Sequence, residues 1–105
     1  MARISTHVLD TSLGRPAEGI AIELHRGSTL LASAVTDPDG RTAEPLLQSG
    51  LLPCGVYTLT FRVGDYLAES FYETISVSFT VRSGVENYHI PLLLSPYGYS
   101  TYRGS

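Results

Sequence analysis

The sequence contains no lysine and only one cysteine. Its basic charge comes from seven arginines, which stand against four aspartates and six glutamates, for a formal net charge of −3. That balance provides no basic surface of the kind that nucleic acid or an anionic membrane attracts, so neither is expected as a partner. The single cysteine, Cys54, excludes an internal disulfide framework and a cysteine-based zinc site, and it fits a reducing compartment.

Long apolar runs are also missing. The longest, residues 90–94, falls far short of the roughly 20 residues that a helix needs to cross a bilayer. The first residues lack the basic region and the continuous apolar stretch of a signal peptide, which favours a cytoplasmic location. With 105 residues, of which 43% are hydrophobic, the chain is expected to form a single domain over residues 1–105.

What the sequence does contain is alternation of apolar and polar residues with a period of two, the pattern of half-buried β-strands. Glycine and proline fall between the alternating segments, where the chain must reverse. We therefore predict an all-β domain built as a two-sheet antiparallel sandwich. Only residues 65–70 could hold a helix, of one or two turns. The predicted strands lie near residues 4–9, 20–25, 30–35, 56–63, 75–82, 88–95 and 98–103. Of these, residues 30–35 are a less regular apolar run and are expected as a buried strand.

One residue breaks the strand pattern. Pro91 lies inside an otherwise regular strand, where it cannot donate a main-chain hydrogen bond, and it is therefore expected at a sheet edge or a β-bulge. Violations of a local rule often mark functional sites, so the neighbourhood of Pro91 is of interest.

Three histidines are the only side chains whose ordinary titration lies near neutral pH. His7 and His89 lie opposite the stronger core residues of their strands and share a face with Leu9 and Leu93, respectively. A monomeric sandwich normally leaves one sheet face wet, so two apolar outer faces indicate burial by a partner subunit. Taken alone, each of these histidines is more simply interpreted as a strand residue with a hydrogen-bonded ring. His25 is expected to be exposed and is assigned no role.

Two further segments leave alternatives open. Arg41 follows the turn Asp-Pro-Asp-Gly at residues 37–40, and it is either a solvated turn residue or a planar, permanently charged group that can hold a carbonyl or a developing oxyanion. The C-terminal residues 102–105, Tyr-Arg-Gly-Ser, are either a frayed end or the continuation of the strong β and turn pattern before them. The spacing of these residues does not decide between the alternatives.

Motifs of several enzyme classes are absent. The sequence has no phosphate-binding Gly-Lys-Ser/Thr loop, no Gly-x-Gly-x-x-Gly fingerprint and no Gly-x-Ser-x-Gly nucleophile elbow. The three histidines are not spaced as metal ligands, so neither a metal site nor a cofactor is expected. Composition and spacing alone therefore indicate a small, oligomeric β-sandwich with two strand histidines.

Three segments of the chain form a distinctive set. They are Ser-Thr-His-Val-Leu-Asp-Thr with Gly-Arg-Pro-Ala (residues 5–11 and 14–17), Thr-Asp-Pro-Asp-Gly-Arg (36–41), and Tyr-His-Ile-Pro-Leu-Leu-Leu-Ser-Pro running into Gly-Tyr-Ser-Thr-Tyr-Arg-Gly-Ser (88–96 and 98–105). Together these segments resemble the transthyretin-like 5-hydroxyisourate hydrolases. The resemblance spans essentially the whole chain, and the terminal Tyr-Arg-Gly-Ser is highly specific to that family.

The resemblance implies a prealbumin-like sandwich of two four-stranded sheets with one short helix. It also implies a homotetramer, in which two edge-to-edge dimers pack face to face around a central channel, with the active sites at the dimer–dimer interface. The catalytic residues that it implies are His7, Arg41, His89 and Ser105, and the substrate-binding set adds Tyr102, Arg103 and Gly104.

The reaction that the resemblance implies is the hydrolysis of 5-hydroxyisourate, a step of urate breakdown, to 2-oxo-4-hydroxy-4-carboxy-5-ureidoimidazoline. Such chemistry needs an activated water, a stabiliser for the tetrahedral oxyanion and a proton for the leaving nitrogen. A neutral histidine can take the water's proton and Arg41 can hold the negative charge, while Tyr102 and Ser105 would shape and close the pocket. The sequence leaves open which histidine is the base and which the acid.

A second function class remains as an alternative: a carrier of transthyretin type that binds flat aromatic ligands in a central channel without converting them. Two histidines and an arginine argue against it, because binding alone requires neither titratable groups nor a guanidinium.

The sequence departs from the family pattern at three places. Residues 64–72 are shorter than the family's usual connection, which reduces the expected helix to as little as one turn. Ser83 replaces a usual Asp, and Asn87 replaces the first histidine of a His-Tyr-His triplet. Since the essential histidine of that triplet is the second, His89, the change at Asn87 concerns helper contacts rather than the catalytic set.

Overall fold

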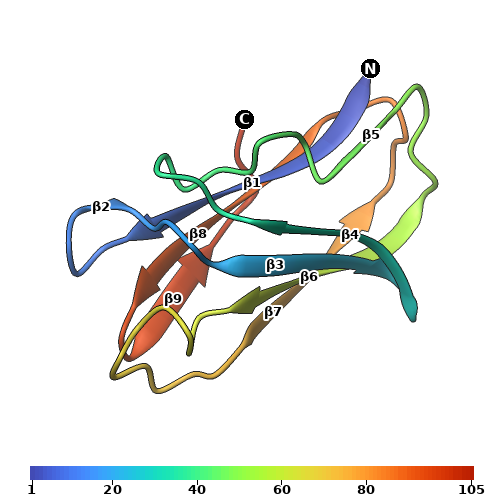
Figure 1. Ribbon diagram of the computed structural model, residues 1–105. Coiled ribbons are helices and arrows are strands. Elements are labelled where there is room, and N and C mark those ends of the chain that lie inside the picture. The colour runs from blue at the N-terminus through green and yellow to red at the C-terminus, as the bar shows by residue number, and fades with distance from the viewer.

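The computed structural model describes all 105 residues as nine β-strands joined by turns, with no helix (Figure 1). The sequence predicts seven of these strands; the other two, β2 and β5, have two and three residues and are too short to show a period. The strands are β1 (Ala2–Asp10), β2 (Arg15–Pro16), β3 (Ala21–Arg26), β4 (Thr29–Val35), β5 (Leu47–Ser49), β6 (Gly55–Arg62), β7 (Ile75–Val81), β8 (Tyr88–Ser95) and β9 (Gly98–Thr101).

The strands form two sheets that pack on each other, so the predicted two-sheet sandwich is confirmed. One sheet has the order β2-β1-β8-β9, with β5 also paired to β1, and the other has the order β4-β3-β6-β7. Strands from the two ends of the chain lie side by side in the first sheet, and the second is built from the middle of the chain (Figure 1). No helix in the structure is long and apolar enough to cross a membrane, and the cytoplasmic location stays a prediction.

The expectation of a wholly antiparallel sandwich is wrong at one strand pair. β1 and β8 run parallel, in register from Ile4 opposite Tyr88 to Asp10 opposite Leu94. A tight hairpin can join only antiparallel neighbours, whereas the whole second sheet lies between β1 and β8 in the chain and makes a parallel pairing possible. This register decides which side chains of the two strands become neighbours.

The helix predicted over residues 65–70 is also wrong. These residues form turns, in which the N–H groups of Tyr66 and Leu67 both donate to the carbonyl of Val63, at 3.1 and 3.0 Å. So short a segment forms too few intrahelical hydrogen bonds to offset the cost of helix nucleation. A tertiary contact holds it instead: the hydroxyl of Tyr66 donates to Oδ2 of Asp10 at 2.7 Å and ties the turns to the end of β1.

Pro91 lies neither at a sheet edge nor at a bulge, because β8 runs between β1 and β9 in regular register. A proline can occupy this position because the pairing of β8 with β9 is interrupted there. The ladder of hydrogen bonds ends at Leu92 opposite Thr101, and beyond the gap one isolated β-bridge pairs His89 with Gly104. The main-chain carbonyl of His89 points toward the chain after β9. In a strand, the main-chain groups of residues two apart point to the same side, so the main-chain nitrogen of Pro91 also points toward β9. The missing N–H of Pro91 therefore falls in the gap.

The alternation predicted for the site-bearing strands is confirmed. Residues of β1 and β8 that face inward join a core of 19 buried hydrophobic residues, while His7, Leu9, His89 and Leu93 lie half-buried on the outer face. His25, expected to be exposed, is half-buried on the outer face of β3 in the other sheet.

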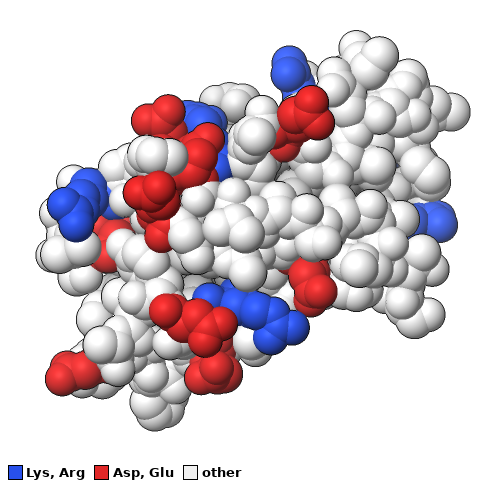
Figure 2. Space-filling view, in the orientation of Figure 1, with Lys and Arg blue, Asp and Glu red and all other residues white.

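Acidic and basic side chains are interspersed on the face shown in Figure 2, which carries no continuous basic patch.

Candidate active site

His89 occupies the outer face of β8. The parallel register places Ser5 of β1 directly opposite it, and the Ser5 hydroxyl lies 2.9 Å from Nδ1 of the ring. A hydroxyl can donate or accept, so this contact is compatible with a hydrogen on Nδ1. With that hydrogen directed at Ser5, the lone pair of Nε2 is free.

His7 lies on the same outer face, two residues further along β1 than Ser5. Its Nε2 is 2.8 Å from the carbonyl oxygen of Asp39. Because a carbonyl only accepts, Nε2 must carry the hydrogen, which fixes the tautomer of a neutral ring. His7 thereby joins β1 to the turn that precedes Arg41.

That turn, residues 36–41, packs directly against β1. Oδ1 of Asp37 accepts from the main-chain N–H groups of Asp39 and Arg41, at 2.9 and 3.1 Å. Gly40 has a φ of +75°, and a Cβ there would lie 2.3 Å from the carbonyl oxygen of Val8, so only glycine fits. The Val8 N–H donates to the Gly40 carbonyl at 2.8 Å and fixes the turn, and with it the main chain of Arg41.

The C-terminal tail returns to β8 beyond the gap at Pro91. The N–H of Gly104 donates to the His89 carbonyl at 2.7 Å. A Cβ on Gly104 would lie 2.7 Å from Cδ2 of the His89 ring, closer than real Cβ atoms approach. Glycine at this position therefore allows the tail to pass against the imidazole.

Gly104→Ala is expected to displace the His89 ring or the tail and to lower kcat by about tenfold or more, since an error of about 1 Å in a catalytic group can cost 100-fold. Gly98→Ala is the matched control, because a Cβ there meets only the Ser95 hydroxyl, at 3.7 Å. Steady-state kinetics of both variants checks this. Equal activity of the two would show that the close packing of Gly104 on His89 has no catalytic consequence.

The predicted site residues converge only in part. Arg41, His89 and Ser105 border one open cavity of about 450 Å³, whereas His7 lies beside His89 without lining it. The complete lining of the cavity is Arg3, Ser5, Thr6, Arg41, Thr42, Ala43, Glu44, Pro45, Asn87, His89 and Ser105.

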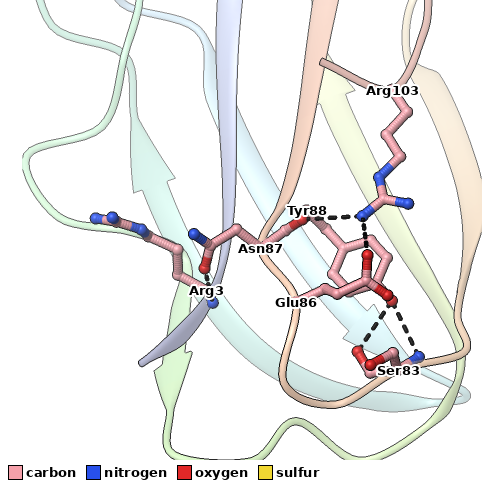
Figure 3. Close-up of polar contacts among 6 residues, drawn as sticks. All are labelled: Arg3, Ser83, Glu86, Asn87, Tyr88 and Arg103. Atoms are coloured by element: carbon pink, nitrogen blue, oxygen red, sulfur yellow. Dashed lines mark hydrogen bonds and ion pairs between the residues drawn. The ribbon is translucent and has the colours of Figure 1, made fainter. Parts of the chain in front are cut away.

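Tyr102 and Arg103 do not line this cavity within one chain. They border a separate groove with residues of β7 and β8, and Tyr102 is 56% exposed. The Arg103 guanidinium stacks on the Tyr88 ring, 4.5 Å from its centroid, and donates to the Asn87 carbonyl at 3.1 Å and to Glu86 at 3.4 Å (Figure 3). Arg103 thus packs against the main chain just before His89.

The electrostatics of the site favour an uncharged His89. Burial lowers the pKa of His89 below its ordinary value, and the positive charge of Arg41 and then the neighbouring His7 lower it further. A lowered pKa means that the ring is neutral and can accept a proton at neutral pH.

Sequence reasoning missed three polar residues of the site. Ser5 shares the alternating face of His7, but its contact with His89 follows only from the parallel register. Arg3 lies two residues before Ser5 on the same face and received no role. Asn87 was identified only as a departure from a triplet, although it lines the cavity.

The fold and this group of side chains define a class: a two-sheet β-sandwich with two histidines on the outer face of one sheet and an arginine in the turn beside them. A model of the HIUase/Transthyretin family matches residues 4–104. The chain belongs to this family.

Individual relatives agree with that assignment. The 5-hydroxyisourate hydrolase of Halalkalibacterium halodurans is 47% identical over 116 aligned positions, covering 98% of this chain and 98% of that protein. The solved structure of Klebsiella pneumoniae 5-hydroxyisourate hydrolase superposes with a TM-score of 0.90 at 39% identity, with 100% of both chains covered. Sea bream transthyretin in complex with thyroxine superposes with a TM-score of 0.89 at 28% identity, over 98% of this chain and 95% of that one.

Proposed function

We propose that the chain hydrolyses 5-hydroxyisourate at the cavity bordered by His89, Arg41 and Ser105. The observation that carries the proposal is the imidazole of His89, whose pKa is lowered by burial and by Arg41, on the wall of a cavity that also holds a guanidinium. The relatives support it, since the Halalkalibacterium and Klebsiella proteins are named for this activity. The chain is accordingly a hydrolase with a small-molecule substrate.

His89 acts as the general base in this mechanism. In the tautomer whose Nδ1 hydrogen is directed at Ser5, Nε2 takes a proton from a water molecule as the water attacks a ring carbonyl carbon. A tetrahedral oxyanion forms, its collapse breaks the C–N bond, and the proton on Nε2 passes to the leaving nitrogen. One water is consumed, and the six-membered ring opens to 2-oxo-4-hydroxy-4-carboxy-5-ureidoimidazoline.

Arg41 stabilises the oxyanion. Its side chain is exposed and forms no ion pair within the chain, so the fork of the guanidinium is free to hold substrate oxygens. The turn fixes its main chain against β1 through Asp37. Ser105 lines the cavity on another side.

His7 is the second histidine of the proposed site, and it acts by holding the turn. Its Nε2–H donates to the Asp39 carbonyl, two residues before Arg41, so the ring couples β1 to the oxyanion-binding side chain. It also lies close enough to His89 to lower that residue's pKa.

We assign Tyr102, Arg103 and Gly104 to the positioning of the tail. Stacking on Tyr88 and the bonds to Glu86 and Asn87 anchor Arg103 outside the cavity, and Gly104 bonds to His89. The anchored tail thereby presents Ser105 to the cavity. This differs from the direct substrate contact that the resemblance implies for Arg103.

The proposed assembly is a homotetramer, a dimer of dimers. Leu9 and Leu93 leave apolar surface beside the histidines on the outer face of one sheet, and β7 and β9 are unpaired sheet edges. Sedimentation at working concentration is expected to give about four times the chain mass. A stable monomer with full activity would contradict this proposal.

The alternative function, a carrier of aromatic ligands, rests on the similarity to a transthyretin solved with thyroxine. The two functions separate in one assay: the ultraviolet decay of freshly generated 5-hydroxyisourate with and without catalytic amounts of the chain. We expect decay to accelerate in proportion to protein concentration. An unchanged decay, with stoichiometric binding of thyroxine, would favour the carrier.

A further inference from the structure

The cavity has a polar wall that the mechanism does not use. Arg3 of β1 and Asn87, the residue before β8, line it together with His89, Arg41 and Ser105. Both are exposed in the chain, and neither is needed to activate water or to hold the oxyanion.

The orientation of the Asn87 amide is fixed by a main-chain contact. The N–H of Arg3 donates to Oδ1 of Asn87 at 3.1 Å, so Oδ1 must face β1 and the amide nitrogen, Nδ2, must face the other way. Nδ2 has no hydrogen-bond partner within the chain. Asn87 is further fixed by its carbonyl, which accepts from Arg103 at 3.1 Å (Figure 3).

The guanidinium of Arg3 is also unpaired. The two ion pairs of the chain join Arg62 to Glu23 and Arg103 to Glu86, and no side-chain hydrogen bond of Arg3 is formed. In Figure 3 the Arg3 side chain extends away from the Arg103 cluster, on the other side of Asn87. Two sets of donors without acceptors therefore border the cavity next to each other.

We propose that Arg3 and Nδ2 of Asn87 form a specificity wall that binds carbonyl oxygens of the substrate remote from the bond that breaks. The proposal rests on the proposed function, whose substrate is a cyclic ureide with several ring carbonyls. A guanidinium and an amide nitrogen are donors without an acceptor atom, so the wall favours ligands that present oxygens.

Asn87 also gives this wall a property that a histidine would not. An amide keeps its donor at every working pH, whereas an imidazole changes its hydrogens in the range where His89 must stay neutral. The hydrogen-bond donor that Asn87 adds to this wall is therefore the same at every working pH.

The test uses Arg3→Gln and Asn87→Asp in the full chain. Asn87→Asp keeps the oxygen that accepts from the Arg3 N–H but removes the donor, and Arg3→Gln leaves that main-chain contact intact. Each variant is expected to raise KM about tenfold with kcat within about twofold, since binding that is equal in ground and transition states affects KM alone. Arg82→Gln, at an exposed arginine that does not line the cavity, is the control and should leave KM unchanged.

Unchanged KM in both variants, or a fall in kcat at constant KM, would overturn the specificity wall. Calorimetry with urate, a stable cyclic ureide, keeps this test separate from that of the proposed function. If wild type does not hydrolyse 5-hydroxyisourate but binds urate more tightly than both variants do, the wall stands and the proposed function fails. Equal or absent urate binding in that case would overturn both.

Discussion

Replacing His89 by Asn is expected to lower kcat/KM by about 10²–10⁴-fold, the usual contribution of one general base. The substitution removes the only imidazole on the cavity wall, while Asn retains a polar group that can still reach toward Ser5. Folding and assembly should therefore survive. The loss should appear mainly in kcat, because the ring acts on the water rather than on substrate affinity.

Replacing His7 by Asn should also remove most of the rate, but through the loss of a different contact. The shorter side chain withdraws the donor from the Asp39 carbonyl and releases the turn that carries Arg41. Because His7 also lies close enough to His89 to lower its pKa, we expect the two rings to act as one unit on the attacking water, so their losses should not multiply. The double variant is expected to be little slower than the slower of the two single variants.

The measurement is kcat/KM for wild type, the two single variants and the double variant, with sedimentation of each. His25→Asn is the matched control, because His25 lies on the outer face of the other sheet, and its rate should equal that of wild type. Independent, multiplicative losses of a few-fold each would mean that His7 and His89 only line a channel. The carrier alternative would then gain support.

Arg41→Lys is expected to lower kcat/KM by about 10–100-fold with the assembly intact. Loss of one oxyanion donor typically costs 10²–10³-fold in kcat, and lysine keeps the charge but not the planar fork, so the effect should fall somewhat below that range. The main-chain bond from Arg41 to Asp37 is unaffected by the substitution, so the turn itself should persist.

Arg82→Lys provides the comparison, since Arg82 is exposed and does not line the cavity. It should leave kcat/KM at the wild-type value. Turnover near wild type in Arg41→Lys as well would show that Arg41 is a solvated turn residue, the alternative that its position after the Asp-Pro-Asp-Gly turn left open.

Period-two alternation predicted the architecture well because it reports directly on which face of a strand is buried. It gave the longer strands other than β4, the two layers, and the outer-face positions of His7 and His89. The less regular run at residues 30–35 was interpreted as a buried strand; it forms β4, but Leu30 and Val35 are exposed, so its burial was predicted wrongly. It could not give the parallel pairing of β1 with β8, because alternation carries no information on which strands are neighbours. The contact of Ser5 with His89 depends on that pairing and was missed.

The contacts of the C-terminal tail could not be predicted from the sequence for a different reason. The resemblance implied substrate contacts for Arg103, but its guanidinium stacks on Tyr88 and binds Glu86, and neither partner carries a sequence signal for that role. The irregular strand at Pro91 was recognised, but its consequence was not. The gap in the β9 ladder opposite Pro91 lies just before the bridge that brings Gly104 against His89.

Base catalysis requires a neutral His89 in the working enzyme, and the acid limb of the kcat/KM–pH profile measures its ionisation. Because burial, Arg41 and His7 lower the pKa of His89 in the folded chain, the base stays available as pH falls toward 6.5, its ordinary value. Activity should therefore decline only with a midpoint below 6.5, and His89→Asn should abolish that limb. An acid limb at or above 6.5, or one that persists in His89→Asn, would contradict the assignment of His89 as the base.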